Sequence, residues 1–343
     1  MLAGQFILQI DWPRAHADQE AVIGDALLRD DAARVSSISA QACREHLATK
    51  DRQIDVAALA RNASDAVIQH YYGVTTEGAN REDITNWLTV LASAILLLPP
   101  EGSPERAKAD HSADALFAHM RAALVTARQS ELSDERDDVL SRLLAHRRDN
   151  NTRVWLSEDW IARTTCGLAV FGLATVARTA VDAVDELLSR GEATLSSASE
   201  AAANADKNPE ILLGYIYEAL RFRPMLPVLF RYCPRATVIG EATGKPRIVP
   251  RGAAVVTPPL AAMHDSTPFP DPSRFDATRP TKKSLIFGTG LHQCTGRKIA
   301  ERMLVEIVGA LLREPDLRRE KGRSGRVSYD GAAAHRLILL RRG

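Results

Sequence analysis

The sequence predicts one mainly α-helical domain with a small β part, covering residues 1–343. Apolar residues recur at helical spacing through most of the first two thirds of the chain. From Pro224 onward, short β-prone pieces separated by Gly and Pro replace this spacing, which is typical of a small sheet. We therefore expect a helical part over about 1–223 and a β-rich part with a last helix over about 224–343.

The helical part contains a series of expected helices. Periodicity predicts helices over 30–48, 54–73, 81–98, 105–129, 133–144 and 157–190. Pro99 and Pro100 end the third of these, because proline cannot continue a helix. Ser157, followed by two acidic residues, is a good start for the longest one, since these side chains satisfy free amides. The small, polar segment 196–208 is expected to be a loop or a frayed helix.

The β-rich part contains short strands and one further helix. Strand-like pieces cover 237–240, 247–250 and 253–258, and two more lie around 327–329 and 336–340. A helix rich in apolar residues follows Gly296 and runs through Leu312.

Composition excludes several classes of protein. The 44 basic residues nearly balance the 43 acidic ones, so the chain lacks the charge of a nucleic-acid binder or a polybasic membrane protein. Four scattered cysteines without a Cys-x-x-Cys pair exclude a disulfide scaffold and a zinc ribbon. The start does not resemble a signal peptide, and the longest apolar runs, 87–98 and 166–177, are too short to cross a bilayer. We expect a soluble, cytoplasmic protein with no membrane span and no nucleic-acid partner.

The most informative segment is a glycine-rich loop that contains a cysteine and leads into the last helix. Gly288 and Gly290 allow the backbone to fold tightly beneath a planar ligand, where a Cβ atom would clash. Cys294 lies just before the helix, where backbone amides and the helix dipole stabilise a thiolate. A thiolate held in this way is a strong axial ligand for haem iron. The alternative for a single cysteine is a small, buried core residue.

This segment resembles the haem-binding loop of the cytochrome P450 superfamily, whose pattern is Phe-x-x-Gly-x-x-x-Cys-x-Gly. The resemblance implies a P450-like fold, haem b (iron protoporphyrin IX) as cofactor, and Cys294 as the ligand of its iron. It also implies that His292 bonds a haem propionate. The cofactor-binding residues expected from the resemblance in this region are Phe287, Gly288, Gly290, His292, Cys294, Gly296 and Ala300.

Two further segments resemble the same family. Glu218 and Arg221 lie three apart on one helical face and are able to pair, although such pairs are common on solvated helices. The resemblance implies that Arg279, in a Pro-rich segment, completes a buried ion network with them and braces the haem loop. It also places Arg231 against a haem propionate, the alternative being an ordinary surface arginine.

The long helix 157–190 resembles the oxygen-binding stretch of the family, Ala-Gly-x-Asp/Glu-Thr. Gly172 and Thr175 match, whereas Phe171 replaces the small Ala and Ala174 replaces the acid. In the family the acid and the Thr relay protons, and a methyl group cannot act as a general acid. Gly172 is expected either to pass close over a flat ligand or to serve helix packing. The substrate-lining residues expected are Phe171, Met225 and Val228.

The front of the chain departs from the family pattern. Its segment 8–22 resembles Asp-Pro-Pro-x-His-x-x-x-Arg, but Ala15 and Gln19 occupy the His and Arg places. His16 and Arg14 lie one residue away and are candidates to substitute. We therefore expect a shortened fold that lacks roughly the first 60 to 70 residues of the family.

Three functions remain open. The leading one is a P450-type monooxygenase that acts on an apolar or amphipathic small molecule, with a ferredoxin or reductase as electron donor. The missing acid favours a second, a haem-thiolate enzyme that uses peroxides or isomerises hydroperoxides. The third is a non-catalytic helper that binds a partner enzyme, against which the intact Cys loop argues. Basic residues near the loop are either a docking surface for an acidic redox partner or simply solvated: Lys282, Lys283, Arg297 and Lys298.

Overall fold

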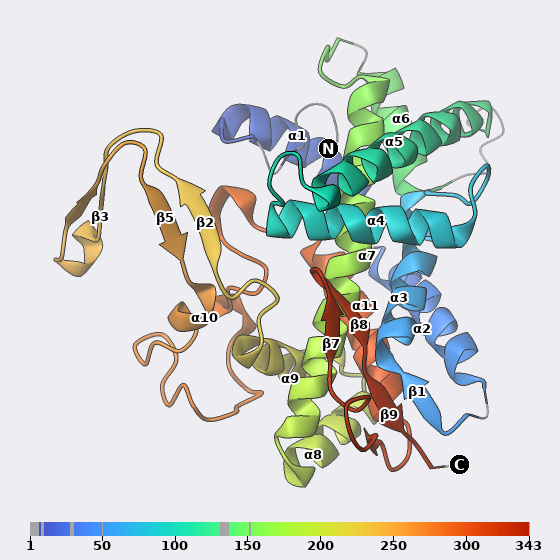
Figure 1. Cartoon of the computed structure of the whole chain (residues 1–343), viewed down its shortest axis with the longest axis vertical. Helices are drawn as coiled ribbons and strands as arrows, with labels where there is room; N and C mark the ends of the chain where they lie inside the picture. The colour runs from blue at the N-terminus through green and yellow to red at the C-terminus, as the bar shows by residue number, and fades with distance from the viewer. Residues whose placement is uncertain are drawn as a thin grey trace.

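The computed structural model describes residues 7, 10–27, 31–49, 51–130, 137–150 and 152–342. It confirms a mainly helical fold with a small β part (Figure 1). The helices are α1 (Pro13–Ala26), α2 (Ala32–Leu47), α3 (Val56–Val67), α4 (Arg81–Leu97), α5 (Pro104–Ser130), α6 (Val139–Asp149), α7 (Glu158–Ser189), α8 (Glu192–Ala203), α9 (Pro209–Phe222), α10 (Pro259–Ala262) and α11 (Arg297–Leu312). A π-helical turn, η2 (Ile68–Tyr72), continues α3.

Side-chain caps explain where several helices begin. The Ser157 hydroxyl accepts a hydrogen bond from the Trp160 amide at the start of α7, at 3.2 Å. Asn80 caps α4 through the Asp83 amide at 2.8 Å. These bonds satisfy amides that have no partner within the helix, so the polar residues before each apolar stretch determine where the helix starts.

Helix α7 is the central helix of the molecule. Helices α3, α4, α5, α9 and α11 pack around it (Figure 1). It is the one helix in the described part of the chain that is long and apolar enough to cross a membrane by length and composition. Because 67% of its apolar window is buried against other helices, its composition is that of a core helix.

The strands form small antiparallel sheets in the part of the chain that the structure describes. Strand β9 (Ile338–Leu340) pairs with both β1 (Gln53–Asp55) and β6 (Arg318–Arg319), and β7 (Ser328–Asp330) pairs with β8 (Ala333–Arg336). Strand β2 (Leu229–Tyr232) pairs with β5 (Ala254–Thr257) in the register Phe230 to Val256, and β3 (Thr237–Ile239) pairs with β4 (Arg247–Val249). The last two pairs form one arm that extends away from the helices (Figure 1).

The structure differs from the sequence prediction in several elements. Residues 192–203 form a regular helix, α8, whereas a loop or frayed helix was expected from residue 196. Alanine is the best helix former, and Ala198, Ala201 and Ala202 of α8 face the core, so the polar residues of this segment did not prevent a helix. The helix expected over 133–144 begins at Val139, and residues 133–136 lie outside the described residues. Strands β1, β2 and β6 are too short, at two to four residues, to show a periodicity.

Candidate active site

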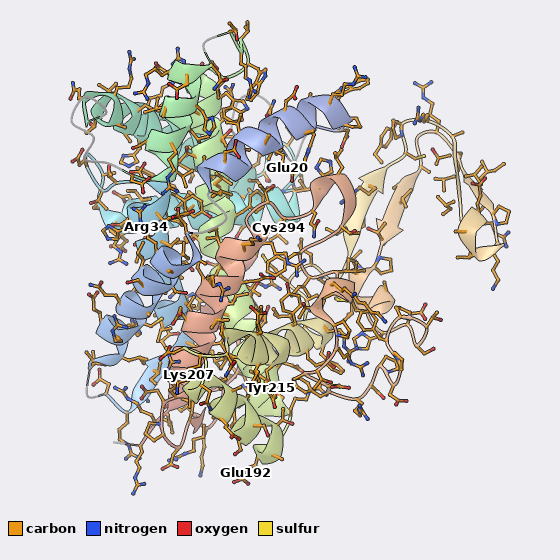
Figure 2. The ribbon with its side chains drawn as sticks, turned by 180° about the vertical axis from the view of Figure 1, so that it is seen from behind. Glu20, Arg34, Glu192, Lys207, Tyr215 and Cys294 are labelled. Atoms are coloured by element: carbon orange, nitrogen blue, oxygen red, sulfur yellow. The ribbon has the colours of Figure 1, made fainter. Side chains whose placement is uncertain are left out.

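The backbone of the Cys loop is tightly folded and positions Cys294 before α11. Gly288 and Gly290 adopt φ values of +68° and +75°, a conformation that other residues rarely take. The Cys294 amide donates to the Phe287 carbonyl at 2.9 Å, and the Arg297 amide donates to the Cys294 carbonyl at 3.3 Å. Figure 2 shows Cys294 at the N-terminal end of α11, below α1. Its side chain is exposed, so it is not a buried core cysteine.

The surroundings of the Cys294 thiol have opposing effects on its pKa. Its pKa is raised, mainly because the surrounding residues displace water. The Gly296 amide and the charge of Arg297 act in the opposite direction and do not overcome this effect. The stabilisation of a thiolate by a backbone amide, expected at this helix N-terminus, is therefore present but is smaller than the opposing effect.

Two histidines meet beside the loop. The rings of His16 on α1 and His292 are 5.2 Å apart and nearly perpendicular. His292 Nε2 lies 2.9 Å from Asp11 Oδ1, whereas the Nδ1 atoms of both histidines are buried and make no hydrogen bond within the described residues. His16 thus lies beside the loop, although in the sequence it is one residue away from the position where the family pattern has its histidine. Gln19 instead accepts a hydrogen bond from Trp160 of α7 at 2.8 Å.

Helix α7 presents a half-buried stripe within its otherwise buried surface. This α7 stripe consists of Leu168, Phe171, Gly172, Thr175, Arg178 and Thr179, spaced three or four residues apart. The Thr175 hydroxyl donates to the Phe171 carbonyl one turn earlier. Ala174 is 4% exposed and belongs to the buried side of the helix.

Tyr72 is a residue of this region that the sequence did not reveal. A Cβ atom on Gly172 would lie 3.4 Å from the Tyr72 ring, an ordinary contact distance, so α7 passes close to η2 at this position. Burial raises the pKa of Tyr72, and Tyr71 and Cys294 add to the effect, so its hydroxyl remains protonated. A tyrosine at the end of a helical pattern is indistinguishable from a core residue in the sequence.

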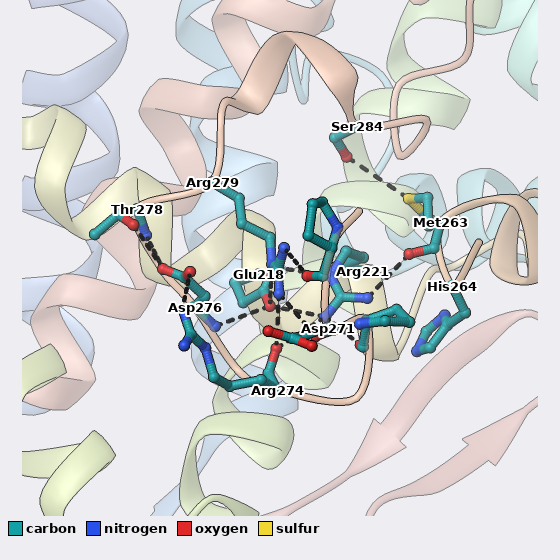
Figure 3. Close-up of polar contacts among 12 residues, drawn as sticks. Glu218, Arg221, Met263, His264, Asp271, Arg274, Asp276, Thr278, Arg279 and Ser284 are labelled. Atoms are coloured by element: carbon teal, nitrogen blue, oxygen red, sulfur yellow. Dashed lines mark hydrogen bonds and ion pairs between the residues drawn. The ribbon is translucent and has the colours of Figure 1, made fainter. Parts of the chain in front are cut away.

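The structure brings Glu218, Arg221 and Arg279 together (Figure 3). Arg221 donates to both carboxylate oxygens of Glu218 at 2.8 and 2.9 Å, and Arg279 Nε donates to the same carboxylate at 3.3 Å. Arg221 also donates to the Met263 and Pro272 carbonyls at 2.9 and 2.8 Å. Glu218 is 3% exposed and Arg221 is 2% exposed, so the network is buried. Its hydrogen bonds join α9 to the segment before the Cys loop.

The remaining predicted residues differ in exposure. Met225 and Ala300 are half-buried, and Val228 is exposed. Arg231 is exposed on β2, where it donates to the Phe230 carbonyl at 2.9 Å. Nothing in its contacts within the described residues joins Arg231 to the Cys loop.

Comparison with known proteins identifies the family. The family model "Cytochrome P450" matches residues 81–332, and the chain therefore belongs to the cytochrome P450 family. Cytochrome P450 107B1 of Saccharopolyspora erythraea is 30% identical over 254 residues, which are 74% of this chain and 55% of that protein. The 6-deoxyerythronolide B hydroxylase of the same organism is 29% identical over 61% of this chain and 46% of its own length. The chain thus spans about half the length of these relatives.

Solved structures show the same fold. Ligand-free CYP164A2 of Mycobacterium smegmatis matches with a TM-score of 0.81 at 23% identity, over 99% of this chain and 82% of that chain. P450BioI, solved with an acyl carrier protein ligated to hexadec-9Z-enoic acid, matches with a TM-score of 0.78 at 21% identity, over 98% and 81% of the two chains.

The residues present fit the haem that the family implies. Cys294 offers an exposed sulfur, and the positive φ values of Gly288 and Gly290 fold the loop tightly next to it. The buried Nδ1 atom of His292 makes no hydrogen bond within the described residues and is suited to an anionic carboxylate such as a haem propionate, whereas His16 Nδ1 lies 3.6 Å from the Glu20 carboxylate.

Proposed function

We propose that the protein is a haem-thiolate monooxygenase of the cytochrome P450 type that acts in the cytoplasm on an apolar or amphipathic small molecule. The observation that carries this proposal is the exposed Cys294 thiol in an intact loop, held by backbone hydrogen bonds through both its amide and its carbonyl. A non-catalytic helper would not need this exposed sulfur, so the loop favours an enzyme.

The chain's own residues have distinct tasks in this proposal. Cys294 binds the iron of haem b, and His292, with His16 beside it, bonds a propionate. When bound, the haem supplies the redox chemistry that inserts oxygen into the substrate. Phe171 of the α7 stripe, together with Met225 and Val228, provides apolar contacts for the substrate.

Proton delivery relies on Thr175 and water. The Thr175 hydroxyl is held on the α7 stripe by its bond to the Phe171 carbonyl. Ala174 has no ionisable group, so this position cannot act as general acid, and protons must come through water. A peroxide brings its own proton and electrons, so we propose that the protein also accepts peroxides in place of a ferredoxin or reductase donor.

The reduced, CO-bound absorption spectrum tests the proposal. The wild-type protein, reconstituted with haem, is expected to give the thiolate-type band, and Cys294→Ser to lose it. Cys233→Ser is the matched control, because Cys233 is buried on the arm and its sulfur donates to the Arg235 carbonyl at 2.9 Å. A protein that takes up no haem, or a Cys294→Ser variant that keeps the band, would contradict the proposal.

A further inference from the structure

A second cluster on α9, distinct from the Glu218 network, lies directly against the Cys loop. Tyr217 of α9 donates its hydroxyl hydrogen to the Glu301 carboxylate of α11. Arg297, one turn before Glu301, donates through Nε to the same carboxylate at 2.7 Å. The guanidinium of Arg297 lies 5.7 Å from the centre of the Tyr217 ring and 5.8 Å from that of the Phe287 ring.

Two members of this cluster hold the backbone of Cys294 from both sides. Phe287, whose ring is 6.0 Å from that of Tyr217, accepts the hydrogen bond of the Cys294 amide at 2.9 Å. Arg297 donates its amide to the Cys294 carbonyl at 3.3 Å. The side chains of both residues pack against Tyr217. A shift of the Tyr217 ring would therefore move the two residues that hold the Cys294 backbone, and the sulfur with it.

The cluster also balances the charge beside the sulfur. Arg297 and Glu301 carry opposite charges and form an ion pair at 2.7 Å next to the loop. Burial and Glu301 raise the pKa of Tyr217, which therefore stays a hydrogen-bond donor. Arg297, whose side chain is 29% exposed, is thus bound to Glu301.

We propose that Tyr217, Glu301 and Arg297 form a positioning network that holds Cys294 in place for the haem iron. The inference rests on the proposed function of Cys294 as the iron ligand. Groups that orient a ligand of a metal typically contribute a factor of about 10–100 to metal affinity. The network is separate from Glu218 and Arg221, which connect α9 to the segment before the loop.

Two pairs of variants test the network in the haem-loaded protein. Tyr217→Phe removes only the hydroxyl, and its control is Tyr215→Phe on the same helix, whose ring faces Phe275 at 6.4 Å. Glu301→Gln removes the charge that pairs with Arg297. Its control is Glu210→Gln, because Glu210 pairs across the same two helices with Arg302 at 4.0 Å and is 73% exposed.

Three quantities are measured for each variant: the rate of haem transfer to excess apomyoglobin, the CO-bound spectrum, and the unfolding temperature of the haem-free protein. Tyr217→Phe and Glu301→Gln are expected to speed haem transfer about tenfold and to lower the fraction of thiolate-type band. The controls are expected to stay within about twofold of the wild type. Unfolding temperatures should not separate Tyr217→Phe from Tyr215→Phe.

The inference is overturned if both variants match their controls in transfer rate and spectrum while the wild type shows the thiolate-type band. It is also overturned if their haem loss only parallels a lower unfolding temperature. A wild type without that band overturns the proposed function itself, and this inference with it, so the two failures are distinguishable.

Discussion

Replacing Glu218 by Ala is the most direct test of what holds the Cys loop in place. The Glu218 carboxylate accepts hydrogen bonds from Arg221 Nε and Nη2, from Arg279 Nε and from the Asp276 amide, the last at 2.9 Å. The substitution removes all four bonds at once and leaves the Arg221 guanidinium, 2% exposed, without a counter-charge.

The expected loss in the free energy of unfolding follows from the burial of the Arg221 guanidinium. Removing one partner of a buried ion pair typically costs about 3–5 kcal/mol, because the remaining charge is not compensated. This is a large share of the roughly 5–15 kcal/mol that stabilises a folded domain. Glu218→Gln keeps an acceptor oxygen for the Asp276 amide but loses the charge and the second acceptor, which faces Arg221 Nε, so we expect a smaller cost of about 1.5–3 kcal/mol.

Urea unfolding of the haem-free protein measures both effects. The shift of the midpoint, multiplied by the slope of the transition, gives the change in the free energy of unfolding. Glu210→Ala is the control, since Glu210 is 73% exposed and a surface substitution usually changes this free energy by less than about 0.5 kcal/mol. The reasoning is refuted if Glu218→Ala is no more costly than Glu210→Ala.

Three further predictions concern other parts of the molecule. Gly214→Ala would place a Cβ atom 2.4 Å from the Ala277 carbonyl oxygen, so we expect urea unfolding to show a loss of about 1–3 kcal/mol, and an unchanged midpoint would contradict this. The Thr278 hydroxyl, and Arg274 after it, lower the pKa of Asp276 from 3.8 to about 2. Because this pKa is lower in the folded state than in the unfolded state, Asp276 contributes its full stabilisation of the fold above the unfolded-state pKa. This contribution is lost as the pH falls through about 2, so Asp276→Asn should make the free energy of unfolding depend less on pH in that range. Ala174→Asp should raise the product formed per electron consumed, because it restores a general acid, and should change peroxide-driven turnover much less; the same yield per electron in both proteins would contradict the importance of the missing acid.

The sequence by itself determined the features whose signals are local. The Cys loop is a pattern within ten residues, and its glycines mark the positions of positive φ directly. Glu218 and Arg221 lie one turn apart on the same helix, and the long helices follow from periodicity and from caps such as Ser157. Each of these features depends on neighbours in the chain, so it was predictable before the fold was known.

Only the tertiary structure decided which distant side chains meet. His16 faces His292 although the two residues are 276 positions apart in the chain. In the sequence, the family pattern places its histidine at Ala15, one residue before His16. Tyr217 of α9 likewise bonds Glu301 of α11, a contact that no local sequence pattern indicated. Such contacts depend on how helices rotate and cross, and a helical pattern reports which face is apolar but not which residue of another element packs there. For the same reason the sequence could indicate a thiolate ligand, whereas the groups that hold Cys294 in place became visible only in the folded chain.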